Sequence, residues 1–183
     1  MTENLKYDLI ERDDEIEIRR YPAYIKAEVI VDARNYRNAI ERGFSALADF
    51  IFGNNVTRSK IDMTTPVQAS PAEKIAMTTP VTVTKTGQYT VAFIMPSVYT
   101  MDSLPVPNNQ RIRITPVAEH KAAAIRFNGY FNADKINRSQ EKLSRWLEEH
   151  GLEAEGDFIV AGYNPPWVPG FLARNEVMVV FKS

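Results

Sequence analysis

The pentapeptide MTTPV occurs twice in this sequence, at residues 63–67 and 77–81. Methionine thioethers adapt to flat apolar ligands, so Met63 and Met77 are a candidate ligand-contacting pair. Proline cannot donate to a strand ladder and pushes the preceding residue to extended geometry, so each copy is expected to kink an edge strand. A strand corner with a purely structural role is the alternative for both copies.

A second candidate is an aromatic loop close to the end of the sequence. Residues 163–171 read YNPPWVPGF, and three prolines and a glycine would stiffen the backbone around Trp167. A rigid loop that presents an aromatic side chain suits the rim of a ligand pocket. A packed crossover loop is the alternative.

Composition excludes several kinds of site. The 183 residues include no cysteine and only two histidines, His120 and His150. Disulfides, thiolate nucleophiles, iron–sulfur clusters and cysteine-ligated zinc are therefore excluded, and no metal site is expected. No Ser/His/Asp set, P-loop or dinucleotide fingerprint is recognisable. We expect no catalytic residues, and Glu176 with Tyr163 would be the acid–base pair if the protein were an enzyme.

The charge balance and hydropathy bear on location and partners. The chain has 22 Lys+Arg against 23 Asp+Glu, so no electrostatic force would hold it on nucleic acid or on an anionic membrane. No apolar run reaches the roughly 18 residues that span a bilayer, and the start, MTENLKYDLIERDDE, turns acidic where a secretory signal is apolar. We expect a cytoplasmic monomer or weak oligomer whose partner is a small molecule.

An internal repeat predicts the elements that must position these residues. A shift of 96 residues places 16–51 on 112–147, and nine pairs of large apolar residues then coincide, where chance gives about four. We therefore expect a single domain over residues 1–183 that contains two pseudo-repeats, at about 7–97 and 103–183.

Both copies change their hydrophobic period in the same order. Ile16 and Ile18 alternate with charged residues, as in a strand, whereas Ile40, Phe44 and Leu47 recur at the spacing of a helix. The expected elements are strands within 16–31, 75–84 and 89–95 around a helix at 36–53, and strands within 112–127, 157–163 and 176–181 around a helix at 132–150. This duplicated β-α-β-β unit predicts an α+β fold, in which an antiparallel sheet, curved or closed into a distorted β-barrel, has two flanking helices.

Four groups of residues resemble one known family. They are EIRRY at 17–21, KIAMTTPV at 74–81, MPSVY at 95–99, and AGYNPP at 161–166 with RNEV at 174–177. In this order, over nearly the whole chain, they resemble the SOUL haem-binding family, and the doubled MTTPV is similar to its bacterial branch. The resemblance implies a duplicated β-α-β-β fold that binds haem or another tetrapyrrole in an apolar groove beside the first helix.

The resemblance also implies how such a ligand would be held. Some members have a proposed iron-ligating histidine where this chain has Arg20, so a bound haem would be weakly ligated. Groove methionines of other members correspond here to Phe44 and Ala48, and carboxylates stand at the positions of the basic groove residues. Arg42 and Arg174 would supply cations for the propionates from nearby positions.

The expected groove lies between the first helix and a rim formed by Met63, Met77 and the Trp167 loop. Gly43 and Ala46 are small, so they would let a flat ligand approach the helix backbone. The implied function is that of a tetrapyrrole carrier or buffer.

The repeated unit also resembles the regulatory ligand-binding domain of some bacterial transcription factors. That domain commonly holds cationic apolar ligands with a buried acidic residue in its last strand, and Glu176 stands at a comparable place. A lone buried carboxylate needs a cation or a raised pKa. An effector-binding domain is therefore the alternative function, and a structural ion pair of Glu176 with Arg174 or another residue is the alternative role.

Overall fold

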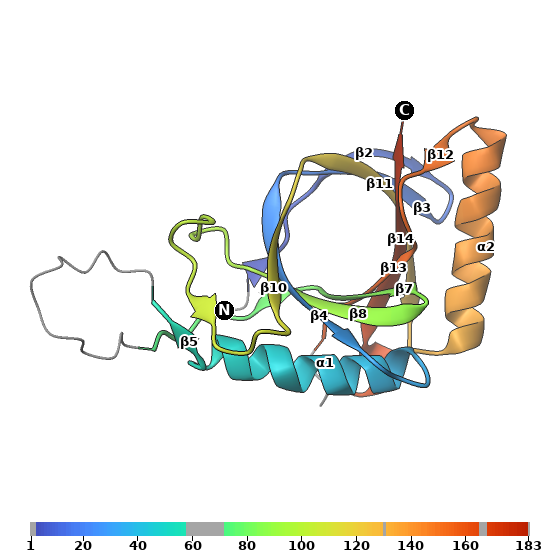
Figure 1. The fold of residues 1–183 in the computed structure, drawn as a ribbon. Helices are drawn as coiled ribbons and strands as arrows, with labels where there is room; N and C mark the ends of the chain where they lie inside the picture. Colours follow the sequence, from blue (N-terminus) through green and yellow to red (C-terminus); the bar gives the residue numbers. More distant parts are fainter. Residues whose placement is uncertain (1–2, 58–71, 130, 165–167, 183) are drawn as a thin grey trace, which may run out of the picture.

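The computed structural model describes residues 3–57, 72–129, 131–164 and 168–182. Met63 and Trp167 lie outside these ranges, as does the first MTTPV copy. A curled sheet forms the middle of the molecule, and two long helices lie on its outside (Figure 1).

The elements follow the predicted order in both halves of the chain. The first half contains β1 (Glu3–Asn4), β2 (Asp8–Asp13), β3 (Ile16–Tyr21), β4 (Tyr24–Val31), α1 (Tyr36–Ile51), β5 (Asn55–Val56), β6 (Thr78–Thr79), β7 (Val81–Thr86) and β8 (Gln88–Ile94). The second half contains β9 (Val106–Pro107), β10 (Arg113–Val117), β11 (His120–Asn128), α2 (Ala133–Glu149), β12 (Glu153–Ala154), β13 (Ile159–Gly162), the 3-10 helix η1 (Gly170–Leu172) and β14 (Arg174–Lys182). The predicted helices at 36–53 and 132–150 are thus confirmed to within two residues at each end.

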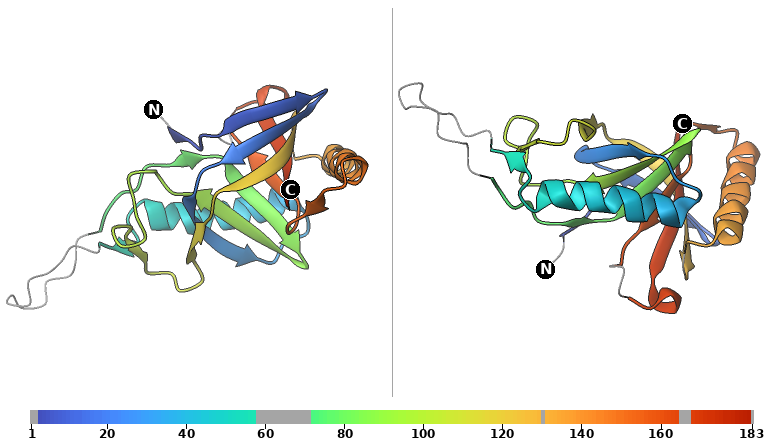
Figure 2. Two further views of the ribbon diagram at one scale, coloured as in Figure 1. Left: turned by 90° about the horizontal axis from the view of Figure 1, so that it is seen from above. Right: turned by 60° about the horizontal axis from the view of Figure 1, so that its bottom comes forward.

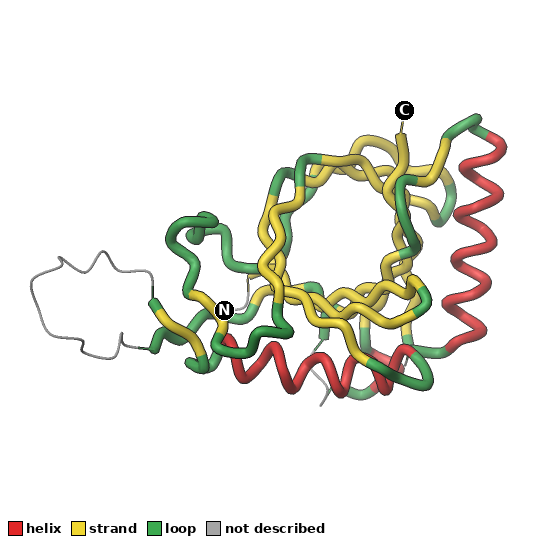
Figure 3. Tube along the Cα trace, in the orientation of Figure 1, coloured by secondary structure: helices red, strands yellow, loops and turns green. Residues whose placement is uncertain are grey.

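The main sheet has ten strands, and its neighbouring strands are antiparallel. Their order is β10-β4-β8-β7-β13-β14-β11-β3-β2, with β12 added on β14. The strands curl into a ring-like arrangement in Figure 3, but the hydrogen-bonded order begins at β10 and ends at β2. The predicted α+β fold with two flanking helices is confirmed, and the sheet is curled rather than closed. In the described part of the chain, no helix has the length and apolar character needed to cross a membrane.

The two halves exchange their first strands. The strand β3 pairs with β11 of the second half, and β10 pairs with β4 of the first half. The registers are reciprocal, because Tyr21 lies opposite His120 and Tyr24 lies opposite Val117. The shift of 96 residues that relates the repeats converts one of these pairs into the other, so the sheet order carries the same internal symmetry as the sequence.

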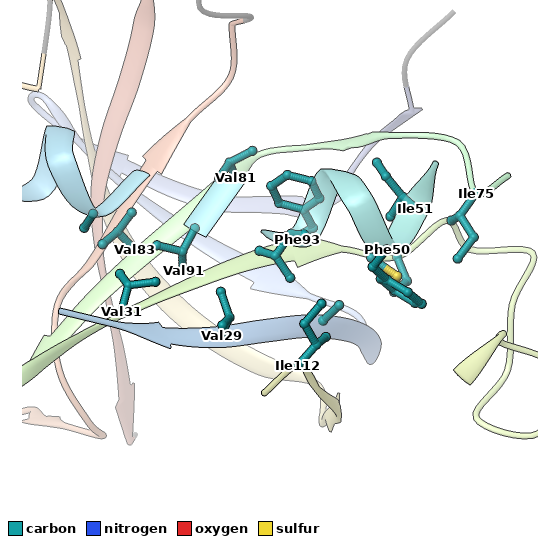
Figure 4. Close-up of a cluster of buried hydrophobic side chains, with 14 of the residues drawn as sticks. Val29, Val31, Phe50, Ile51, Ile75, Val81, Val83, Val91, Phe93 and Ile112 are labelled. Carbon is teal, nitrogen blue, oxygen red and sulfur yellow. The ribbon is translucent and has the colours of Figure 1, made fainter. Parts of the chain in front are cut away.

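Each helix covers the outer face of one half of the sheet. Alternate residues of β4 and β8, such as Val29 and Phe93, pack with Leu47 of α1 in one buried cluster (Figure 4). Val177 of β14 packs with Leu143 of α2 in a second cluster. Figure 2 shows that α1 and α2 lie on different sides of the curl. The remaining strand residues therefore face the inside of the curl.

The helix α1 lies close to the sheet at Gly43. A Cβ atom at this position would lie 2.4 Å from the Cβ of Val91 on β8, so only glycine fits here without a shift of the helix or of Val91. The hypothesis that Gly43 makes room for a ligand is therefore wrong, because its free side faces the sheet. The equivalent residue of α2, Ser139, is also buried and donates its hydroxyl to the Lys135 carbonyl at 2.8 Å.

The second MTTPV copy is a bend between two strands. Pro80 separates β6, which pairs with β1, from β7, which pairs with both β8 and β13. The predicted change of direction fits this exchange of partners. The prediction of an edge strand is wrong for β7, because it has hydrogen-bonded neighbours on both sides and Pro80 lies outside both ladders.

Candidate functional site

A buried ion-pair network occupies the inside of the curled sheet. Glu176 of β14 is fully buried, and Arg19 of β3 is 1% exposed. Arg19 Nη1 donates to Oε2 of Glu176 at 2.7 Å, and Nη2 donates to Oε1 at 2.8 Å. Between these strands runs β11, whose buried alanines Ala122 and Ala124 are small enough for the guanidinium to reach across.

The Glu176 carboxylate has two further partners. Arg174 donates to Oε1 through Nη2 at 2.7 Å and through Nε at 3.2 Å. The Tyr163 hydroxyl donates to Oε2 at 2.7 Å. Burial alone would raise the pKa of Glu176, but hydrogen bonds and charge from Arg19 and Arg174, together with the Tyr163 hydroxyl, lower the pKa below its ordinary value. The carboxylate is therefore ionised, and both of its oxygens accept hydrogen bonds from donors of the protein itself.

Arg19 is enclosed in the same way. Its Nε and Nη2 donate to Oε2 of Glu17 at 2.8 and 2.6 Å, and its Nη1 donates to the Tyr21 hydroxyl at 2.9 Å. The Tyr7 ring covers one face of the guanidinium, with Cζ 4.2 Å from the ring centroid. We call Glu17, Glu176, Tyr7 and Tyr21 the guanidinium cage.

These contacts give Glu176 the structural ion pair that was the alternative to a ligand-binding role. The cation that its buried carboxylate needs is supplied by Arg19 and Arg174, which is the structural alternative. Sequence reasoning missed Arg19, although its alternation with Ile16 and Ile18 places it on the opposite face of β3. That face would be solvated in a flat sheet, whereas the curl of this sheet encloses it.

The network also bears on Tyr163 as an acid–base group. Burial and the adjacent carboxylate raise the pKa of its hydroxyl well above the ordinary tyrosine value. The hydroxyl therefore stays protonated at neutral pH and acts as a donor to Glu176.

A small cavity lies beside the guanidinium cage, inside the curl. Its volume is about 50 Å³, and its lining comes from both halves of the chain: Leu5, Tyr21, Tyr24, Lys26, Pro80, Thr82, Thr84, Ile94, His120, Ala122, Ile159, Met178 and Val180. Pockets for drug-sized ligands usually measure roughly 300–1,000 Å³. A porphyrin-sized molecule therefore does not fit in this cavity.

A wider hollow of about 540 Å³ lies on the outer face of α2. Its lining is mostly polar or charged, and consists of Asn137, Gln140, Glu141, Ser144, Arg145, Glu148 and Phe158. Only Phe158 would offer a flat apolar ligand a sizeable apolar contact. This hollow therefore has the size but not the chemistry of a tetrapyrrole site.

Of the predicted residues of the first helix, Phe44 packs on the outer apolar cluster together with Met77. Phe44 is half-buried, and its ring centroid lies 5.2 Å from that of the buried Phe93. Met77 is half-buried against the same cluster, and Ala48 is 8% exposed. Arg42 is exposed, and its Nη1 donates to the Asp32 carbonyl at 2.8 Å.

Arg174 lies elsewhere, in the network inside the sheet. Its guanidinium binds Glu176 and covers the Tyr163 ring, with Cζ 4.2 Å from the centroid. The eight predicted site residues thus divide into Arg42, Phe44, Ala48 and Met77 on α1 and its cluster, Arg174 and Glu176 inside the sheet, and Met63 and Trp167 outside the described residues.

The described residues provide apolar surface for a tetrapyrrole but no histidine beside α1. Arg20, at the position where the resemblance implies a histidine, is exposed. His120 lines the inner cavity, and His150 stacks on Trp146 at the end of α2, 4.2 Å between centroids. Across the described ranges, no group of three or more His, Cys, Asp or Glu side chains could hold a metal ion.

Comparison with known proteins identifies the family. The sequence model of the family described as SOUL heme-binding protein matches residues 2–180. Heme-binding protein 2 of Homo sapiens is 29% identical over 168 residues, which cover 91% of this chain and 78% of the human protein. The Mus musculus protein of the same name is 28% identical over 169 residues, with the same two coverages.

A solved structure supports the fold. The crystal structure of the EcmrR C-terminal domain matches with a TM-score of 0.66 and 9% identity, covering 97% of this chain and 98% of that domain. At this identity the likeness concerns the fold alone. The family match spans nearly the whole chain, and the chain therefore belongs to the SOUL haem-binding protein family.

Proposed function

We propose that this protein binds haem and related tetrapyrroles non-covalently on the outer apolar surface of α1, as a cytoplasmic carrier or buffer. The observation that carries the proposal is a half-exposed apolar row on one side of α1, formed by Tyr36, Ile40 and Phe44. Met77 is half-buried on the same cluster. Membership of the SOUL family and the name of the human relative support a tetrapyrrole as the ligand.

Apolar contact supplies the affinity in this proposal. Each 100 Å² of apolar surface removed from water contributes about 2.5 kcal/mol, and the flat face of a macrocycle buries surface on both partners. The energy of such a contact does not depend on the central metal. A bound haem would supply a redox-active iron, but a carrier needs only the apolar faces and carboxylates of the molecule.

Arg42 is the candidate partner for the carboxylates. It is an exposed cation of the same helix, and one of its nitrogens is engaged by the Asp32 carbonyl. A guanidinium has five N–H donors, so the remaining donors of this exposed side chain are sufficient for a propionate.

A titration of wild-type protein with haemin and with metal-free protoporphyrin, followed by absorbance and tryptophan fluorescence, tests the proposal. We expect both ligands to bind with equal affinity, because apolar contact tolerates either form. A six-coordinate bis-histidine spectrum of the haem complex would contradict it.

The variant Phe44→Glu locates the site. A charge in the apolar row must lose water when the ligand covers it, so we expect the affinity for both porphyrins to fall about 30-fold, equivalent to about 2 kcal/mol. The matched control is Gln140→Glu, at the equivalent position of α2, which should bind as the wild type does. Equal affinity of folded Phe44→Glu and wild-type protein would exclude α1 as the binding surface.

The alternative function, an effector-binding domain for cationic ligands, depends on the inside of the sheet. A cation that used Glu176 would have to displace Arg19 and Arg174, which make four of the five hydrogen bonds to this carboxylate. Titration of the wild type and of Phe44→Glu with tetraphenylphosphonium separates the two functions, since binding of this hydrophobic cation that is unchanged in Phe44→Glu would favour the effector-binding domain.

A further inference from the structure

We infer that the inside of the curled sheet is a complete guanidinium-binding site, and that its resident ligand is the side chain of Arg19. Arg19 is then the residue that determines specificity inside the sheet. With Arg19 present, the site is closed to cationic ligands. Without it, the guanidinium cage should take up a small free guanidinium ion.

The first argument is the number of hydrogen bonds. A guanidinium carries five N–H donors in a planar arrangement. Arg19 makes five hydrogen bonds of 2.6–2.9 Å, two to Glu176, two to Glu17 and one to the Tyr21 hydroxyl. Each donor therefore has an acceptor, and the Tyr7 ring covers the flat face. Acceptors in the plane and an aromatic ring above it are what a planar cation requires.

The second argument is charge. Two carboxylates, Glu17 and Glu176, face the guanidinium, and the exposure of their side chains is 20% and 0%. Arg174 neutralises part of Glu176, and Arg12, with a side chain 61% exposed, binds Glu17 from the solvent side. Removal of Arg19 would leave Glu176 with Arg174 and Glu17 with the exposed Arg12, and the fully buried Glu176 carboxylate would lose its two hydrogen bonds from Arg19, which is unfavourable.

The third argument is access. The small inner cavity adjoins the guanidinium cage, because Tyr21 belongs to both and donates its hydroxyl to Met178 Sδ at 3.2 Å. Truncation of Arg19 to alanine would join the space of its side chain to this cavity. A planar ion of a few heavy atoms then has both a route and a binding site.

Chemical rescue of Arg19→Ala tests this inference. We expect the variant to have a lower Tm than the wild type, and methylguanidinium chloride at 50 mM to raise that Tm by about 3–6 °C if its Kd is about 5 mM. Sodium chloride at the same ionic strength and urea, which is planar but uncharged, should not raise it. Intermolecular nuclear Overhauser effects from the methylguanidinium methyl group to Tyr21 and Met178 would locate the bound ion.

Two variants control for general effects of the ion. Arg20→Ala removes an exposed arginine from the same strand and should not respond to methylguanidinium, like the wild type. In Arg19→Ala/Glu176→Gln the main acceptor has lost its charge, and the rise in Tm should disappear. If Arg19→Ala folds only in the presence of methylguanidinium, the inference is supported in its strongest form.

Two results would overturn the inference. One is an Arg19→Ala protein that neither folds nor gains stability with methylguanidinium. The other is an equal rise in Tm with sodium chloride or in Arg20→Ala, because that would reflect ionic strength alone. Porphyrin binding is not used in these measurements, so their outcome is independent of the function proposed for α1.

Discussion

Glu176 shows how strongly one buried side chain depends on its partners. The variant Glu176→Gln would replace the buried carboxylate with a neutral amide, so Arg19 and Arg174 would have no anion to face at this position. Loss of one partner from a buried ion pair costs about 3–5 kcal/mol, so we expect the free energy of unfolding in urea to fall by this amount. The control Glu119→Gln changes an exposed carboxylate and should stay within about 0.5 kcal/mol of the wild type. A Glu176→Gln protein as stable as this control would show that the ion pair contributes little.

The same network determines how stability depends on pH. Burial raises the pKa of Glu17 and Glu176, but their arginine partners outweigh burial, so both pKa values lie below the ordinary 4.5. A depressed pKa in the folded state stabilises the protein fully above pH 4.5, and this stabilisation is lost as the pH falls through the folded pKa. We expect urea midpoints to decrease below pH 4.5, and to decrease less steeply in Glu176→Gln. Identical slopes in the two proteins would rule out Glu176 as a source of the acid sensitivity.

At the scale of elements, the close packing of α1 on β8 depends on the absence of a side chain at Gly43. An alanine here would gain about 1 kcal/mol in helix propensity, but its Cβ would overlap Val91, and overpacking costs about 1–3 kcal/mol. We expect Gly43→Ala to lower the free energy of unfolding in urea by about 1–2 kcal/mol relative to the wild type. Ser139→Ala, at the equivalent position of α2, should be tolerated, because that helix already accommodates a Cβ. Equal effects at both positions would mean that the two helices approach the sheet alike.

At the scale of the whole molecule, we propose that residues 1–183 form one domain that cannot be divided between its repeats. Each half lacks one strand of its own sheet, because β3 pairs with β11 and β10 pairs with β4. We expect fragments 1–102 and 103–183 to be unfolded separately and to form a one-to-one complex when mixed. Circular dichroism and size-exclusion chromatography would follow this. A fragment that folds alone with a native-like helix would contradict the single-domain proposal.

Much of the architecture follows from the sequence alone. The positions of α1 and α2, the order of strands and helices and the shift of 96 residues are all visible in the spacing of apolar residues. Helices and strands repeat with different periods along the chain. The spacing of apolar residues therefore shows which element forms and which residues lie on its apolar face. The family is visible for a similar reason, since its recognisable fragments are short and keep their order.

The tertiary structure alone decides which residues meet. Arg19 and Glu176 are 157 residues apart, and nothing in the neighbourhood of either one indicates the other as its partner. Their meeting depends on the exchange of β3 and on the curl that turns the charged face of this strand inward. Gly43 was expected to make room for a ligand, but it makes room for Val91 of β8. The sequence does not distinguish these roles, because a small residue allows close approach of either a ligand or a neighbouring strand. Local spacing determines the elements, whereas pairings between distant strands determine which charges are buried and which surface remains for a ligand.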